Sequence, residues 1–296
     1  MNILVIRLGA LGDVIQSFGP FAAIRAHHPG ARITLLTTPP FAKLLAASPW
    51  FDAIWDDGRP GWRGLPALAR RLRGWGFDRV YDLQTSSRSS RYRWLLRGAE
   101  WSGIARGASH PHANPDRDRM HTIERQREQL EMAGITAFPT PDLTWLSADL
   151  APFALPARFV LLVPGASPLR PAKRWPAAQF GAVAAGLDLP CVVIGSAAES
   201  PLAKEILALA PGTLDLTGRT SLPAIAALAQ RAACALGNDT GPTHLIAATG
   251  CPTLALFGED SDPALCAPRG AAVQVLRRQP IGAITPEEVL AAISPR

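Results

Sequence analysis

The chain has 296 residues, of which 48% are hydrophobic and 18% are charged. This composition predicts a soluble globular protein of two ordinary domains and excludes a disordered or fibrous chain. Basic residues outnumber acidic ones by six, and the excess lies in residues 1–148, which hold 19 basic and 13 acidic residues, whereas residues 149–296 hold 11 of each.

The cysteines and the apolar runs exclude several further classes. Cys191, Cys234, Cys251 and Cys266 form no CxxC pair, so a disulfide or zinc framework is not expected. The N-terminus lacks the pattern of a secretory signal, and no apolar run approaches the roughly 20 residues of a membrane span. We therefore expect a cytoplasmic protein, and a peripheral contact at the inner face of the membrane stays open.

Strands and helices alternate along the first half, a pattern that predicts a parallel sheet. In chain order, we expect a strand over 2–7, a helix over 14–24, strands over 31–38 and 51–55 with a helix over 41–47 between them, a helix over 66–75, a strand over 79–83 and a helix over 121–133. His110, His112 and His121 lack a carboxylate or cysteine at a ligand spacing, so no metal site is expected. Prolines crowd residues 139–156, the best candidate linker.

The second half repeats the same architecture. We expect strands over 158–163, 191–194, 232–236, 253–257 and 273–276, and helices over 176–186, from about 199, over 223–231, from about 242 to 249, and over 286–293. The fold class is therefore α/β, with two doubly wound parallel sheets, and the domains are expected at 1–150 and 151–296.

One stretch carries the most chemistry, the loop from Gly237 to His244 between a strand and a helix. Thr240 or Asp239 can cap the helix, Pro242 suits its first turn, and Gly241 lets a ligand approach the free amides, which favours a phosphate. A carboxylate repels phosphate, so Asp239 is better placed against a neutral sugar. Together these features indicate a nucleotide sugar, while the simpler interpretation is only a capped helix.

Several other polar residues have two interpretations. Asp13 in the loop after the first strand either caps the next helix or acts chemically. Lys173, one of three lysines, either holds a phosphate or lies on the surface, and Glu199 either binds both ribose hydroxyls or complements a helix dipole. The arginine-rich stretches at 70–75 and 88–97 either attract an anionic lipid, glycan or nucleic acid, or form a solvated helix face.

Four ordered motifs, taken together, resemble those of glycosyltransferase family 9, the heptosyltransferases of the lipopolysaccharide inner core. The motifs are Arg7-Leu8-Gly9-Ala10-Leu11-Gly12-Asp13, Asp82-Leu83-Gln84, Lys173-Arg174-Trp175-Pro176 and Gly237-Asn238-Asp239-Thr240-Gly241-Pro242-Thr243-His244. The resemblance implies a GT-B fold of two Rossmann-like domains facing a cleft, with the acceptor on residues 1–150 and the nucleotide sugar on residues 151–296.

The resemblance also implies roles for residues. Asp13 would be the general base, Lys173 and the backbone at Thr240 and Gly241 would hold the diphosphate, and Asp239 would contact the sugar. The whole donor set would be Ser167, Lys173, Glu199 at the ribose, Thr220 and Ser221 near the base, Asp239, Thr240, Gly241 and His244. The acceptor set would be Gly12, Gln84 and Arg88. No metal and no cofactor are expected. An inserted-looking Leu169-Arg170-Pro171 lengthens the loop before Lys173 relative to the family.

The sequence therefore predicts an inverting, metal-independent transfer of heptose from ADP-heptose to an anionic Kdo-lipid A type acceptor. Two alternatives stay open, namely a family 9 transferase with another nucleotide sugar or acceptor and a non-enzymatic binder of anionic polymer. The polymer binder would use the arginines with Trp75, Tyr92 and Trp94, but it leaves the Asp239 loop unexplained. Nucleic acid is therefore not the expected partner.

Overall fold

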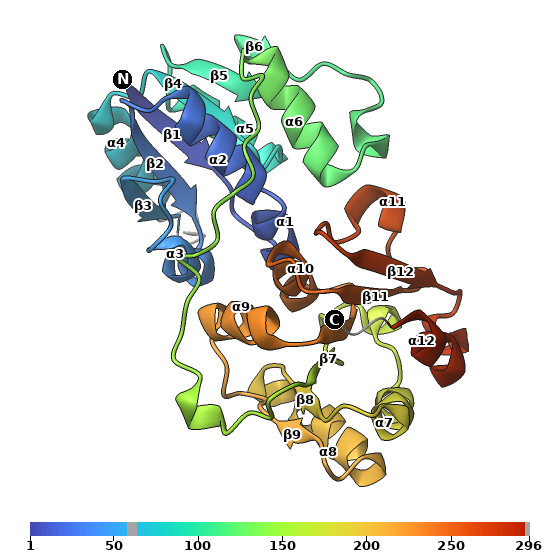
Figure 1. Cartoon of the computed structure of the whole chain (residues 1–296). Coiled ribbons are helices and arrows are strands. Elements are labelled where there is room, and N and C mark those ends of the chain that lie inside the picture. Colours follow the sequence, from blue (N-terminus) through green and yellow to red (C-terminus); the bar gives the residue numbers. More distant parts are fainter. Residues whose placement is uncertain (58–63, 294–296) are drawn as a thin grey trace. The chain divides into compact units, whose positions relative to one another are not determined.

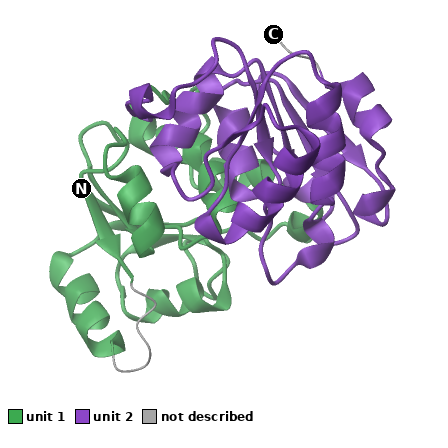
Figure 2. Ribbon diagram, turned by 90° about the horizontal axis from the view of Figure 1, so that it is seen from below, with its two compact units in different colours: residues 1–145 green, residues 146–296 purple. Residues whose placement is uncertain are grey.

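The structure is a computed structural model that describes residues 1–57 and 64–293 (Figure 1). The chain divides into two compact units, Met1–Trp145 and Leu146–Arg296 (Figure 2). The division lies inside the proline-rich stretch that the sequence marks as a linker. No helix among the described residues is both long and apolar enough to cross a membrane.

Unit 1 is built on a six-stranded parallel sheet with the order β3-β2-β1-β4-β5-β6. Its strands are β1 (Asn2–Ile6), β2 (Arg32–Thr37), β3 (Ala53–Asp56), β4 (Arg79–Asp82), β5 (Glu100–Gly103) and β6 (His110–Pro111). The predicted strands are confirmed within one to three residues at each end. We did not predict β5 and β6, because β5 is a short segment with polar residues and β6 is a two-residue edge strand.

The helices of unit 1 follow the expected alternation with two differences, because one predicted helix is divided and the short helix Ser87–Arg91 is not among the predicted ones. They are α1 (Leu11–Ile15), α2 (Phe18–His27), α3 (Pro39–Leu45), α4 (Leu65–Trp75), α5 (Ser87–Arg91) and α6 (Thr122–Met132), with short 3-10 turns η1 (Tyr92–Trp94) and η2 (Arg117–Arg119). The single helix predicted over 14–24 is divided into α1 and α2. Pro20 has no amide hydrogen to donate to the carbonyl four residues earlier, so a continuous helix is interrupted before it.

The strands of unit 2, counted from its own first strand, are arranged in the same order as those of unit 1. The parallel sheet of unit 2 runs β12-β11-β10-β7-β8-β9. The strands are β7 (Val160–Val163), β8 (Cys191–Val193), β9 (Leu214–Asp215), β10 (Cys234–Asn238), β11 (Thr253–Phe257) and β12 (Val273–Arg277). All were predicted except β9, which has only two residues.

The helices of unit 2 are α7 (Ala177–Gly186), α8 (Ser200–Leu209), α9 (Leu222–Arg231), α10 (Gly241–Ala248), α11 (Pro263–Cys266) and α12 (Pro286–Ala292). Short 3-10 turns complete it, namely η3 (Ala151–Phe153), η4 (Pro171–Lys173), η5 (Ala197–Glu199) and η6 (Ile281–Ala283). Its strands carry continuous apolar runs, because helices cover a parallel sheet on both faces.

In both sheets the strand order reverses beside the first strand, between β1 and β4 in unit 1 and between β7 and β10 in unit 2. Open α/β sheets bind ligands outside the carboxyl ends of the strands at such a switch point. The loops that begin after β1, β4, β7 and β10 are therefore the places to examine.

Candidate functional site

Asp13 lies at the carboxyl end of β1, in the first helical turn after it. Its Oδ2 accepts a hydrogen bond from the Ala10 amide at 3.1 Å, and its Oδ1 lies 3.2 Å from an Arg7 guanidinium nitrogen. The carboxylate remains 41% exposed. It is therefore held in one orientation and is open to a substrate, as a general base requires.

Arg7, which we did not predict as a site residue, holds Asp13 from inside the protein. Its side chain is only 4% exposed, and Nη1 donates to the Leu83 carbonyl at 2.5 Å. Burial lowers the pKa of Arg7, and the charge of Asp13 offsets part of that effect. A buried guanidinium needs such partners, so Arg7 and Asp13 form one unit. Its position at the end of the first predicted strand, inside the motif that ends at Asp13, is the sequence signal that could have identified it.

The predicted acceptor residues lie at the same edge of unit 1 and have structural partners. Gly12 is in α1, and the Gln84 side chain accepts a hydrogen bond from the Leu8 amide at 2.8 Å, which joins the loops after β4 and β1. Arg88 donates to Asp57 at 2.6 Å and to the Tyr92 hydroxyl at 3.0 Å. Its side chain is 36% exposed, so one face of the guanidinium stays open.

Asp82, at the end of β4, is a buried carboxyl beside this edge. It is fully buried, its Oδ1 accepts from the Thr85 amide at 3.0 Å, and its Oδ2 has no partner among the described residues. Burial raises the pKa of Asp82 to about 7, although the bonds from its neighbours and the charge of Arg7 oppose the shift. The native state therefore holds a proton on Asp82 in a pH range where the unfolded chain has lost it.

This shift predicts a pH-dependent stability. Because the pKa of Asp82 rises from an ordinary 3.8 to about 7 on folding, its contribution to stability is present below about pH 4 and is lost as the pH rises to about 7. Asp82→Asn is expected to flatten the difference in urea midpoint between pH 5 and pH 8 and to raise the midpoint at pH 8. An unchanged difference in the variant would contradict this assignment.

In unit 2, the loop between β10 and α10 is built around an ion pair. Lys173 Nζ lies 2.5 Å from Asp239 Oδ2, and His244 Nε2 lies 3.3 Å from Asp239 Oδ1. Burial would raise the pKa of Asp239, but the bonds from His244 and Lys173 outweigh it, and the pKa falls to about 2. The repulsion expected between Asp239 and a phosphate is thus reduced by a cation already bound to it.

Asn238 joins three loops at the switch point of unit 2 and was not predicted as a site residue. Its Nδ2 donates to the Pro164 carbonyl at 2.8 Å, and its Oδ1 accepts from the Trp175 amide at 3.1 Å. Its own carbonyl accepts from the Thr243 hydroxyl at 2.7 Å. The side chain is fully buried. Asn238 therefore fixes the segment of Lys173 and the start of α10 against the end of β7.

The N-terminus of α10 is arranged as we predicted for an anion, with one difference. Thr240 is the N-cap residue and has an extended backbone, and Pro242 lies in the first turn. Neither Thr240 nor Asp239 caps the helix through its side chain, since Thr240 makes no such bond and Asp239 binds Lys173 and His244 instead. The amides of Gly241 and Thr243 have no bond within the helix, as in any first turn, and helix N-termini attract anions.

A cavity of about 350 Å³ lies beside this N-terminus, within unit 2. Four of the predicted donor residues line it, together with Gly165 and Gly195. They are Ser167, Glu199, Thr220 and Thr240. The volume lies within the range of small-molecule sites.

Glu199 is placed in the cavity by two glycines. Its Oε2 accepts from the Ser196 amide at 2.6 Å, which closes a capping box at η5. A Cβ atom on Gly165 would lie 1.8 Å from Glu199 Oε1, so only glycine there leaves room for the carboxylate. Glu199 therefore caps a turn and also presents a carboxylate to the cavity, and its binding of a ribose stays a prediction.

The remaining predicted donor residues lie around the cavity without lining it. Ser221 Oγ accepts from the Ala224 amide at 3.3 Å and caps α9. The neighbouring Thr220, which does line the cavity, has a buried Oγ1 without a partner among the described residues. Lys173, Asp239 and His244 form the ion-pair network, with Gly241 at the start of α10. The structure thus gathers the donor set within unit 2 and the set of Asp13, Gly12, Gln84 and Arg88 within unit 1.

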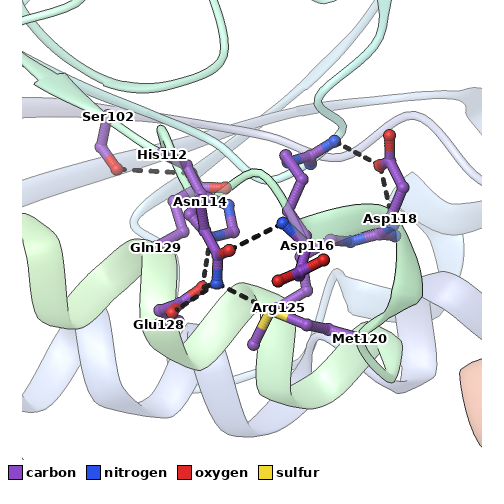
Figure 3. A network of polar contacts seen from close by, with 10 residues as sticks. Ser102, His112, Asn114, Asp116, Asp118, Met120, Arg125, Glu128 and Gln129 are labelled. Carbon is purple, nitrogen blue, oxygen red and sulfur yellow. Dashed lines mark hydrogen bonds and ion pairs between the residues drawn. The ribbon is translucent and has the colours of Figure 1, made fainter.

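His110, His112 and His121, where the sequence predicts no metal site, each have a different partner. His112 Nε2 lies 2.7 Å from Glu128 Oε2, and Figure 3 shows Asn114 directed at the same carboxylate. His121 Nδ1 accepts from the Ile123 amide at 3.2 Å, and His110 lies 3.8 Å from Glu100. Within residues 1–57 and 64–293, no group of three or more His, Cys, Asp or Glu is placed to hold a metal ion.

The chain is similar to known heptosyltransferases along most of its length. It is 23% identical over 283 residues to the lipopolysaccharide core heptosyltransferase OpsX of Haemophilus influenzae, which covers 86% of this chain and 78% of that protein. The structure of the ADP-heptose lipopolysaccharide heptosyltransferase II of Escherichia coli is similar with a TM-score of 0.78 and 23% identity, over 98% of this chain and 97% of that one.

A more distant likeness is to TibC of Escherichia coli, a dodecameric iron-containing heptosyltransferase solved with ADP-D-beta-D-heptose. Its TM-score is 0.56 and its identity 15%, over 92% of this chain and 62% of that one. These similarities, with the two sheets of one order, confirm the α/β GT-B fold that the motifs imply.

The family itself follows from a direct match. The family model of glycosyltransferase family 9 (heptosyltransferase) matches residues 65–284, which is about three quarters of the chain. The match begins in α4 and ends after η6, so it includes the Asp82, Lys173 and Asp239 motifs. The chain belongs to glycosyltransferase family 9.

Proposed function

We propose that this glycosyltransferase transfers heptose from ADP-heptose to an anionic acceptor of the lipopolysaccharide inner core, of the Kdo-lipid A type. The single observation that carries the donor half is the cavity of about 350 Å³ at the switch point of unit 2, beside the N-terminus of α10. The named relatives that act on lipopolysaccharide support the acceptor half.

The proposed donor site assigns each charge of ADP-heptose a partner. The diphosphate lies at the first amides of α10, close to the cation of Lys173. The ribose lies at Glu199 and the adenine near Thr220, which both line the cavity, and near the adjacent Ser221. Asp239, held by Lys173 and His244, faces the sugar hydroxyls as an acceptor of hydrogen bonds.

We propose an inverting, metal-independent mechanism. Asp13 takes the proton of the acceptor hydroxyl while that oxygen attacks the anomeric carbon on the face opposite the diphosphate. Lys173 and the α10 amides stabilise the charge that develops on the departing ADP. Gly12, Gln84 and Arg88 are the proposed acceptor contacts. The cytoplasmic location expected from the sequence stays a prediction.

Calorimetric titration with ADP, UDP and GDP tests the donor, and the same titration with magnesium or with EDTA tests the metal. The proposal predicts selective ADP binding with the same affinity under both conditions. A preference for UDP would redirect the donor, and a loss of binding or of transfer in EDTA would contradict the metal-independent mechanism.

Thr220→Val is a sharper test of the cavity. Its buried hydroxyl has no partner among the described residues, so the change is expected to leave the thermal midpoint unaltered. The affinity for ADP should fall by about two- to tenfold if that hydroxyl bonds to the nucleotide. Thr285→Ala, which removes the side-chain cap of α12 and does not line the cavity, should show the opposite pattern of lower stability and retained affinity. Unchanged ADP affinity in Thr220→Val would remove Thr220 from the proposed site.

A further inference from the structure

A groove on unit 1 is not used by the proposed reaction. It is a hollow of about 590 Å³ between the end of α4 and the segment that follows α5. We call it the Trp94 groove. Its floor and walls include Leu72, Phe77, Leu95 and Trp94, and Arg73 and Arg97 line it as well.

Trp94 gives the groove its exposed apolar surface. Its side chain is 71% exposed, whereas Tyr92 is buried and Trp75 is partly buried against the core of the unit. The Trp75 ring lies 5.2 Å from that of Trp55, and the Tyr92 hydroxyl donates to buried Asp57 at 2.9 Å. A single exposed indole beside leucine side chains suits the boundary between water and an apolar phase.

The charge at the groove is positive and uncompensated. Residues 64–97 hold eight arginines and two acidic residues, and of these two Asp82 is buried and Asp78 bonds to the Asn2 amide at 2.6 Å. Arg71 stacks on Trp55, and Arg79 and Arg88 have carboxylate partners. In the described part of the chain, Arg73 and Arg97 have no acidic partner.

The groove lies away from the predicted catalytic residue. Gly76 and Phe77 precede β4, and Arg97 precedes β5, so the groove is at the amino ends of these strands. Asp13 is at the carboxyl end of β1, which is parallel to β4. A molecule in the groove therefore occupies a surface separate from the reacting group of unit 1.

We propose that the Trp94 groove docks unit 1 on an anionic phospholipid bilayer. The indole inserts at the headgroup boundary, and Arg73 and Arg97, which line the same groove, bind lipid phosphates. Nucleic acid fits less well, because single strands stack successive bases on several exposed rings, and Trp94 is the one strongly exposed aromatic side chain among the residues that the structure describes. The docking, whose role rests on the proposed function, holds the chain at the membrane that carries the acceptor, while the sheet edge with Asp13 is opposite the groove.

Vesicle flotation of the full chain tests the proposal without donor or acceptor. Binding to phosphatidylcholine vesicles that contain phosphatidylglycerol is expected, with little binding to phosphatidylcholine alone. Arg73→Gln and Arg97→Gln should each weaken partition by about fivefold, and Trp94→Ser by at least as much. Raising the salt from about 0.1 to about 1 M should release the protein, because charge interactions are then screened within about 3 Å.

Two variants at exposed residues outside the groove are the matched controls for the arginine and tryptophan changes. Arg231→Gln and Met132→Ser, which remove an exposed cation and an exposed apolar side chain outside the groove, should bind vesicles like the unaltered chain. Equal losses in these controls, equal binding to neutral vesicles, no vesicle binding, or displacement of vesicles by an oligonucleotide would each overturn the proposal. A chain that binds vesicles through Trp94 and transfers no heptose would refute the proposed function and leave the groove assignment standing.

Discussion

Asp13→Asn is expected to lower kcat by about 10²- to 10⁴-fold, the range of a positioned general base. Asparagine keeps the shape of the side chain and its bond from the Ala10 amide, but it cannot take a proton. The measurement is the steady-state rate of ADP release from ADP-heptose with a saturating Kdo-lipid acceptor.

The affinity for ADP separates loss of chemistry from loss of structure in this variant. It should be unchanged, because every proposed donor residue lies in unit 2 and Asp13 lies in unit 1. Arg7→Met is the companion change. It leaves Asp13 in place without its buried cation, so it should lower kcat and stability together. A kcat in Asp13→Asn within a few-fold of the unaltered enzyme would exclude Asp13 as the base.

Lys173→Met should damage both stability and donor binding. It leaves Asp239, whose side chain is 5% exposed, without its closest cation, and breaking a buried pair in this way costs about 3–5 kcal/mol. If Lys173 also holds the diphosphate, the affinity for ADP should fall by about 10²-fold or more. Chemical unfolding and ADP calorimetry measure the two effects.

The double variant Lys173→Met/Asp239→Asn separates these effects. Without the buried carboxylate, most of the lost stability should return, while ADP affinity should stay low because the cation is still missing. Recovery of ADP affinity in the double variant would mean that Lys173 serves only to neutralise Asp239.

The contribution of Asp239 to stability also depends on pH, and the direction follows from its lowered pKa. Because the pKa of Asp239 is lowered to about 2, its contribution to stability is present above about pH 4 and is lost as the pH falls through 2.

The sequence predicts most of the fold, because apolar residues recur at strand or helix spacing and turn residues mark where the elements end. Strand β11 occupies the predicted residues 253–257, and α10 begins where Gly241 and Pro242 indicate a first turn. The elements that it did not predict are short. Strand β9 has two residues and pairs with β8, and α11 has four residues. Elements this short carry too few residues to show a local pattern.

The motifs name many of the residues that the structure brings together, but they do not indicate how those residues pair. Motifs indicate that Lys173 and Asp239 matter, but nothing in the spacing of 66 residues indicates that they form an ion pair at 2.5 Å. The same holds for Arg7 with Asp13 and for Arg88 with Asp57. Asn238 has no charge and lies in a buried strand, so its role in joining three loops becomes visible only when the strands are placed beside one another.

The most direct test of the account is the transfer reaction itself. The purified chain is incubated with ADP-heptose and a Kdo-lipid A acceptor, and both the released ADP and the mass and anomeric configuration of the product are measured. The account predicts acceptor-dependent ADP release with one heptose added per ADP and the anomeric configuration inverted. Retained configuration would contradict the mechanism, and no acceptor-dependent release of ADP would contradict the proposed function.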